Sequence, residues 1–102
     1  MPKVIVSNEA LRDLTEIFDY LAENDFDIAS AFLREMARRF DMVAANPSMG
    51  AAKSDLMSDL RMFPFRRYNI FYFKTADHVE IYRVLHSSRD IVQLFDQVID
   101  GG

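Results

Sequence analysis

The spacing of apolar residues changes once along this chain, on either side of Asn46-Pro47. Between Leu11 and Ala44 apolar residues recur at intervals of three and four positions, which is the repeat of amphipathic helices. Beyond Leu60, aromatic and β-branched residues fill three stretches separated by turn residues, which is the pattern of strands. Helices followed by a run of strands indicate the α+β class, in which helices pack on one face of a sheet.

The predicted elements follow in the order β-α-α-β-β-β-α. They are a strand over Lys3–Val6, a helix capped by Ser7 or Asn8 that ends near Asn24, a helix capped by Asp27 that ends at Asn46-Pro47, strands over Leu60–Phe63, Arg67–Lys74 and Val79–His86, and a last helix over Ile91–Ile99. The two long helices form an antiparallel hairpin because few residues join them, and the later strands pack on this hairpin as an antiparallel meander. Residues 1–102 make one domain, since this length supports a single core.

Several polar and loop residues receive local predictions. Asp13 falls on the polar side of the first helix, and Ala51–Ser58 shows no period and is predicted as a loop. Ser87, followed three residues later by Asp90, predicts a capping box for the last helix. His86, at the end of the last strand, is expected to hydrogen-bond to the nearby backbone.

Composition narrows the functional classes. The chain has no cysteine and two histidines, so we expect no disulfide, no metal site and no cofactor, and we expect a reducing cytoplasm. No apolar run is long enough for a membrane span, and the first residues do not resemble a signal peptide. The net charge of −4 argues against direct binding of nucleic acid, although Arg61–Gly102 carries six basic and five acidic residues.

The middle strand of the meander is apolar on both faces. Tyr68, Ile70 and Tyr72 share one parity, while Phe71 and Phe73 share the other. One helical hairpin covers one face, so the second face must be covered by the C-terminal helix, by another copy of the chain or by a partner. The candidate partner-binding apolar residues are therefore Phe71, Phe73, Ile91 and Phe95.

Three arginines are expected to surround one turn. Arg61, Arg66 and Arg67 lie on either side of Pro64-Phe65, where their guanidinium groups could hold an acidic partner, a phosphate or only water. We assign them to partner binding.

Four segments, taken in order, resemble the RelE/ParE superfamily of toxins from bacterial toxin–antitoxin pairs. They are Asn46-Pro47-Ser48-Met49-Gly50, Leu60-Arg61, Tyr68-Asn69-Ile70-Phe71-Tyr72 and Arg83-Val84-Leu85-His86-Ser87-Ser88-Arg89-Asp90. The resemblance covers nearly the whole chain and is greatest to the ParE branch, whose members are known for poisoning DNA gyrase. It implies a toxin that acts by protein–protein contact, has no catalytic residue, and forms a hetero-oligomer with a ParD-like antitoxin whose C-terminal segment folds onto it.

The same superfamily contains ribosome-dependent endoribonucleases, which is the enzyme alternative. By resemblance, Arg61, Arg83 and His86 would then supply the cations and the acid or base that cleavage of messenger RNA requires. The nucleases generally carry a tyrosine or histidine in the terminal segment, but this chain has none after His86. Arg83 and His86 are also three positions apart on a strand and are expected on opposite faces. A third alternative is an inactive relative that only binds its antitoxin.

Overall fold

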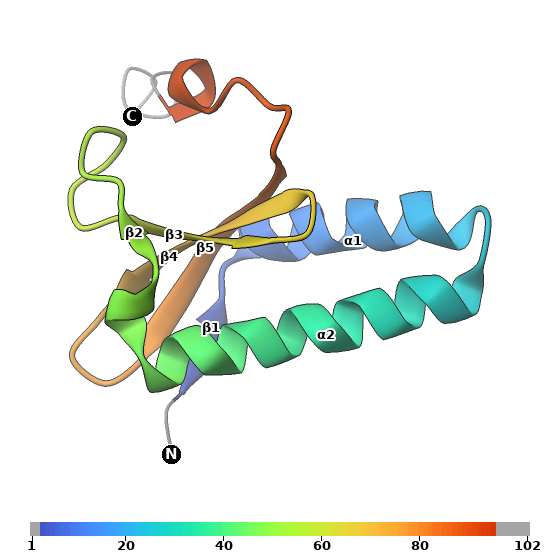
Figure 1. Cartoon of the computed structure of the whole chain (residues 1–102), viewed down its shortest axis with the longest axis horizontal. Helices are drawn as coiled ribbons and strands as arrows, with labels where there is room; N and C mark the ends of the chain where they lie inside the picture. The colour runs from blue at the N-terminus through green and yellow to red at the C-terminus, as the bar shows by residue number, and fades with distance from the viewer. Residues whose placement is uncertain (1–2, 96–102) are drawn as a thin grey trace.

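The chain forms a five-stranded sheet with two long helices on one face (Figure 1), seen here in a computed structural model that describes residues 3–95. The elements are β1 (Val4–Val6), α1 (Asn8–Ala22), α2 (Phe26–Ala45), a short 3-10 helix η1 (Pro47–Met49), β2 (Ala51–Ala52), β3 (Arg61–Phe65), β4 (Tyr68–Lys74) and β5 (Val79–His86). Residues 91–95 are helical. The predicted α+β class is confirmed, and the predicted elements occur in the predicted order with η1 and β2 added between α2 and β3.

The sheet contains the predicted meander and two pairings that were not predicted, β1 with β5 and β2 with β3. Strand β2 lies in the stretch Ala51–Ser58, so the prediction of a loop is wrong at its first two residues, which pair with β3. The strand order of the sheet is β1-β5-β4-β3-β2. Strands β2 to β5 pair antiparallel, whereas β1 pairs parallel with β5, with Val4 opposite Val79 and Val6 opposite Ile81. The parallel pair is possible because the whole helical hairpin and the meander lie between β1 and β5 in the chain.

The helical hairpin begins as predicted but its second cap is different. The Ser7 hydroxyl accepts a hydrogen bond from the N–H of Ala10 and so caps α1. Asp25 caps α2 by accepting from the N–H of Ile28 at 3.1 Å. The prediction of Asp27 as the cap is wrong because Asp25 is the residue with the extended backbone that a cap needs, and Asp27 lies inside the first turn.

Strand β3 is longer than predicted, because it continues through Pro64 to Phe65. The turn to β4 contains only Arg66 and Arg67, so the predicted turn at Pro64 is wrong. In a two-residue hairpin, the register directs the nitrogen of Pro64 away from β4. Strand β2 pairs only with Arg61 and Met62 on that outer side, so no ladder hydrogen bond needs the missing N–H.

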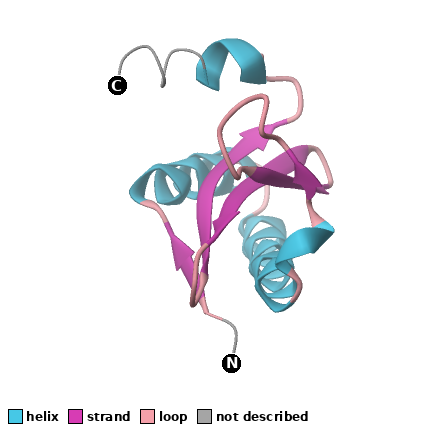
Figure 2. Cartoon of the chain, turned by 90° about the vertical axis from the view of Figure 1, so that its left-hand side faces the viewer, coloured by secondary structure: helices cyan, strands magenta, loops and turns pink. Residues whose placement is uncertain are grey.

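Both faces of β4 are buried, as its two apolar parities predicted. The first core lies between the sheet and the helices and includes Ile70 and Tyr72, and the second lies on the opposite face around Phe71. The second face is covered by the chain itself, through the loop that contains Leu56 and Leu60 and through residues 91–95. Figure 2 shows the C-terminal helical turn on the side of the sheet away from the two long helices.

The last helix starts at a different residue from the one predicted. Asp90 is itself the cap, since its carboxylate accepts from the N–H of Gln93 at 3.2 Å, and Ser87 does not fill that role. Ile91 packs against the second core, whereas Val92 is 59% exposed and does not belong to an apolar stripe. The predicted contributions of Val98 and Ile99 lie outside the described residues. No helix in the described part of the chain is both long and apolar enough to cross a bilayer.

Candidate functional site

A groove of about 480 Å³ opens between the helical hairpin and the turn from β3 to β4. We call it the turn groove. It is lined by Tyr20, Leu21, Phe32, Arg66, Arg67, Tyr68 and His86. These residues come from both helices and three parts of the sheet, so only the folded chain assembles them.

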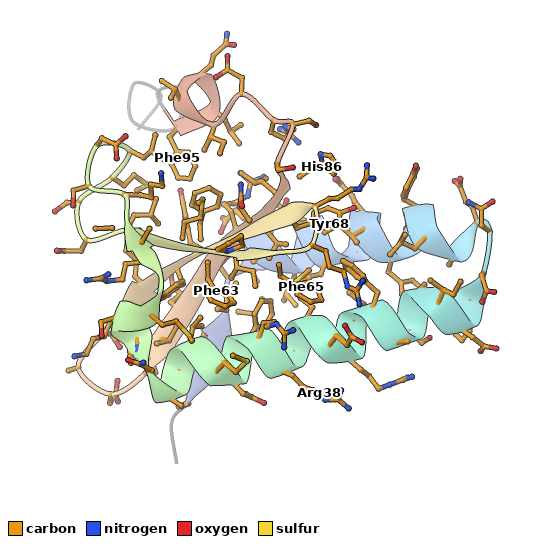
Figure 3. The ribbon with its side chains drawn as sticks, in the orientation of Figure 1. Arg38, Phe63, Phe65, Tyr68, His86 and Phe95 are labelled. Atoms are coloured by element: carbon orange, nitrogen blue, oxygen red, sulfur yellow. The ribbon has the colours of Figure 1, made fainter. Side chains whose placement is uncertain are left out.

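The turn groove has aromatic walls. The ring of Tyr68 lies 5.6 Å from that of Phe32 and 5.3 Å from that of His86, both in edge-to-face arrangements. Figure 3 shows Tyr68 and His86 close together near the end of the β3–β4 hairpin. Burial raises the pKa of Tyr68 above its ordinary value. Tyr20 is 66% exposed and places a further aromatic ring at the rim.

Two arginines form the cationic side of the turn groove. Arg66 donates to a carboxylate oxygen of Glu35 at 2.9 Å, and its guanidinium lies 5.4 Å from the centre of the Phe65 ring. The hydrogen bond and charge of Arg66 lower the pKa of Glu35. Arg67 is exposed, and within residues 3–95 its guanidinium makes no hydrogen bond or ion pair. One cation is therefore engaged and its neighbour is open to a ligand.

Arg61 lies apart from these two residues. It stands at the far end of β3, roughly 13 Å away for a strand of this length, and donates to the carbonyl oxygen of Gly50 at 2.7 Å. The expectation that Arg61, Arg66 and Arg67 surround one turn is wrong because β3 extends through Pro64-Phe65 and separates them.

Tyr72 holds the segment that follows α2. Its hydroxyl donates to the carbonyl oxygen of Pro47 at 2.7 Å and accepts from the N–H of Gly50 at 2.9 Å. A Cβ atom at Gly50 would lie 2.4 Å from this hydroxyl and 2.9 Å from the carbonyl oxygen of Met62, so only glycine fits. The Pro47–Gly50 segment is thus tied to the sheet, and no local pattern in the sequence indicated this contact.

Arg83 is bound by an acidic residue that the sequence analysis misplaced. Asp13 accepts from Nε and Nη2 of Arg83 at 2.8 and 3.0 Å and from the N–H of Val84 at 3.0 Å. Asp13 is 8% exposed, so the prediction that it lies on the polar side of α1 is wrong. The hydrogen bonds to Asp13 raise the pKa of Arg83 further, and the guanidinium is committed to joining α1 and β5.

His86 is held by the turn that follows β5, as predicted. Its Nδ1 accepts from the N–H of Ser88 at 3.1 Å and lies 2.7 Å from the Ser88 hydroxyl oxygen. His86 pairs with Tyr68 and Arg83 pairs with Phe71, so the two side chains leave β5 in opposite directions, but the Arg83 guanidinium reaches Asp13 of α1 on the helix side. Arg61, Arg83 and His86 are therefore each held by a different partner.

The apolar candidates for partner binding belong to the second core. Phe71 is fully buried and Phe95 is 2% exposed, with their rings 5.2 Å apart. Phe73 packs beside Tyr82, and Ile91 lies at the edge of the same cluster. A partner can reach Phe71 only if part of its cover, which is the loop with Leu56 and Leu60 and residues 91–95, moves away. Among the described residues there is no group of three or more potential metal-ligating side chains.

Comparisons with known proteins agree with this architecture. A family model described as the ParE toxin of type II toxin–antitoxin system, parDE, matches residues 4–91. Toxin ParE1 of Mycobacterium tuberculosis is 30% identical over 91 residues, covering 87% of this chain and 93% of the relative. Toxin ParE3 of Caulobacter vibrioides is 31% identical over 86 residues, covering 83% and 86%. The solved chromosomal ParDE TA system from P. aeruginosa superposes with a TM-score of 0.71 at 13% identity, covering 84% of this chain and 96% of that chain.

Proposed function

Because the chain belongs to the ParE toxin family of type II toxin–antitoxin systems, we propose that it inhibits DNA gyrase by protein–protein contact and that a ParD-like antitoxin neutralises it. Gyrase acts on chromosomal DNA, so the proposed site of action is the cytoplasm. The toxin and its antitoxin would form a hetero-oligomer, and the similarity in fold to a solved ParDE toxin–antitoxin system supports this part of the proposal.

The observation that carries a non-enzymatic mechanism is the separate engagement of the three nuclease candidates. Arg61 is bound to the Gly50 carbonyl, Arg83 to the Asp13 carboxylate, and His86 to Ser88. Cleavage of RNA through its 2′-hydroxyl needs a base, an acid and cations around one phosphate. Three residues that are each committed to a different protein group are not arranged around one phosphate, and this supports binding to a protein target as the function.

The test compares two targets with the purified chain. In one arm, DNA supercoiling by gyrase is followed with and without the chain, and in the other arm the integrity of messenger RNA is followed in a translating ribosome mixture. We expect gyrase to be inhibited while messages remain intact. Cut messages with unaffected gyrase would establish the endoribonuclease alternative, and tight antitoxin binding with neither effect would identify an inactive relative.

The variant His86→Ala sharpens this test. We assign His86 no proton transfer, so growth arrest on expression should persist at equal protein level and equal thermal stability. The matched variant Ser88→Ala removes only the hydroxyl partner of the ring and should behave in the same way. Loss of arrest in His86→Ala with restored message integrity and an intact fold would contradict the proposed function.

A further inference from the structure

We propose that the turn groove binds an acidic segment of the antitoxin, with a bulky apolar side chain of that segment against Tyr68 and Phe32 and a carboxylate on Arg67. This inference rests on the proposed function, because it assumes that the chain has an antitoxin. It adds which surface of the toxin is recognised and which chemistry the recognised segment must carry.

The charge of the lining residues favours an acidic ligand. Two arginines and no acidic residue line the turn groove, although the chain as a whole carries a net charge of −4. The nearby Glu35 is already bound by Arg66, whereas the guanidinium of Arg67 makes no ion pair within residues 3–95. The acidic residues Asp13 and Glu16 line a neighbouring hollow that shares Tyr20, Tyr68 and His86 with the turn groove, but they do not line the turn groove itself. A guanidinium without a carboxylate partner is suited to bind one in bidentate geometry.

The walls of the turn groove favour an apolar anchor beside that carboxylate. Leu21 and Phe32 supply apolar surface, and Tyr68 is held from two sides by Phe32 and His86. The volume of about 480 Å³ is within the range of sites that enclose a ligand group. Aromatic residues with an arginine beside them are the usual composition of an energetically important contact in a protein interface.

The backbone of the turn determines where its two arginines lie. Arg66 has φ of 55°, in the left-handed region that favours glycine, although the chain places an arginine there. A two-residue hairpin turn requires a positive φ at its first residue, so this conformation follows from the length of the turn. Here the conformation directs Arg66 towards Glu35 and leaves the next residue, Arg67, at the groove.

A peptide fits these features better than an RNA. The described lining residues hold no lysine, and one of the two arginines is already paired, so little charge remains for a phosphate backbone. The aromatic rings could stack on bases, and a short single-stranded RNA is therefore included as a second probe in the test.

The test measures binding of the protein encoded beside this chain's gene by titration calorimetry, with the wild-type chain and three variants. Arg67→Glu should weaken binding about tenfold or more, and Arg67→Lys should weaken it less, because it keeps the charge but loses the fork of donors. The control is Arg38→Glu on the exposed outer side of α2 (Figure 3), which should change affinity less than twofold. Thermal unfolding of every variant should match that of the wild type.

The outcomes distinguish an error in the groove assignment from an error in the proposed toxin function. Equal affinity of Arg67→Glu and Arg38→Glu would overturn the groove assignment while leaving an antitoxin in place. Absence of binding by the folded wild-type chain would instead contradict the proposed function. Wild-type binding of the RNA probe that Arg67→Glu abolishes, with unchanged protein binding, would assign the groove to nucleic acid and overturn the peptide proposal.

Discussion

Asp13 accepts three hydrogen bonds from β5, and its importance depends on a partner 70 positions away in the chain. Its carboxylate satisfies the Arg83 guanidinium in bidentate fashion and also the N–H of Val84. Loss of one member of such a buried pair leaves the other without compensation, which costs more free energy than the pair itself contributes. Arg83 therefore stabilises the fold by joining β5 to α1, and we assign it no contact with a target.

The variant Asp13→Asn should lower the free energy of unfolding by about 2–4 kcal/mol. The amide has one oxygen and no charge, so it cannot accept from both donors of the Arg83 guanidinium or neutralise it. Denaturant unfolding measures this. Asp19→Asn, at an exposed position on the same helix, is the control and should change stability by less than about 0.5 kcal/mol. Equal effects of the two substitutions would mean that the ion pair adds nothing to the fold.

The variant Tyr72→Phe should cost about 1–3 kcal/mol, since the buried N–H of Gly50 and the carbonyl oxygen of Pro47 lose their partner. Burial raises the pKa of Tyr72 above 10.0, so unfolding releases a proton once the pH passes 10.0, and stability falls as pH rises beyond it. In Tyr72→Phe the free energy of unfolding should fall less steeply above pH 10, and the remaining fall should come from Tyr68, whose pKa is also raised by burial. Stability curves from pH 7 to 11 that coincide in shape would contradict this.

At the scale of elements, the β3–β4 hairpin is closed by two arginines instead of the usual turn residues. Arg66→Gly relieves the positive φ but removes an exposed ion pair, so its stability should stay within about 1 kcal/mol of the wild type. Arg66→Val removes the same pair and adds strain, and should be less stable than the glycine variant by about 1–2 kcal/mol. Thermal unfolding distinguishes them. In both variants the pKa of Glu35, followed by NMR, should rise towards its ordinary value.

Residues 91–95 form the other informative element, because they are attached to the sheet mainly through Phe95. Phe95→Ala should lower stability by about 2–4 kcal/mol, since its ring packs on both Phe71 and Tyr82. Val92→Ala, at an exposed position in the same helical segment, should change stability by less than about 0.5 kcal/mol. Two small and equal losses in denaturant unfolding would show that this segment does not contribute to the core.

At the scale of the whole molecule, one sheet separates two apolar cores. Two long helices cover the first core, whereas the second is covered by a loop and by residues 91–95. The second cover is a loop and one short helical segment, so its local unfolding should require less free energy than global unfolding. This asymmetry determines which face of the sheet can be exposed without unfolding the domain.

Removal of the chain from Ile91 onward should therefore produce a folded but self-associating protein. The truncation uncovers Phe71, Leu85 and Tyr82 together, and a contiguous apolar patch of this kind promotes association. Light scattering should show oligomers for the truncated chain and not for full-length Val92→Ala. A truncated chain that remains monomeric, with unchanged thermal stability, would contradict the assignment of these residues as a cover.

The sequence alone determined the two long helices, the strands β1, β3, β4 and β5 and the two-sided burial of β4, but not the short strand β2. Helix and strand periods, caps and turn residues act over a few neighbouring positions, so Ser7, Asn46-Pro47 and the alternation from Tyr68 to Phe73 could be interpreted directly. The tie of His86 to Ser88 was predictable for the same reason, because the two residues are close together in the turn. Local errors, such as Asp27 for Asp25, amount to a few positions at an element's end.

Only the tertiary structure decided which residues meet across the fold. Asp13 lies on the buried side of α1 because Arg83 comes from a strand 70 positions later, and Tyr72 reaches Gly50 across 22 positions. The turn groove likewise requires α1, α2 and three parts of the sheet at once. Such contacts depend on strand order and register, including the parallel β1–β5 pair, and these follow from packing of the whole chain because no local period of the sequence encodes them.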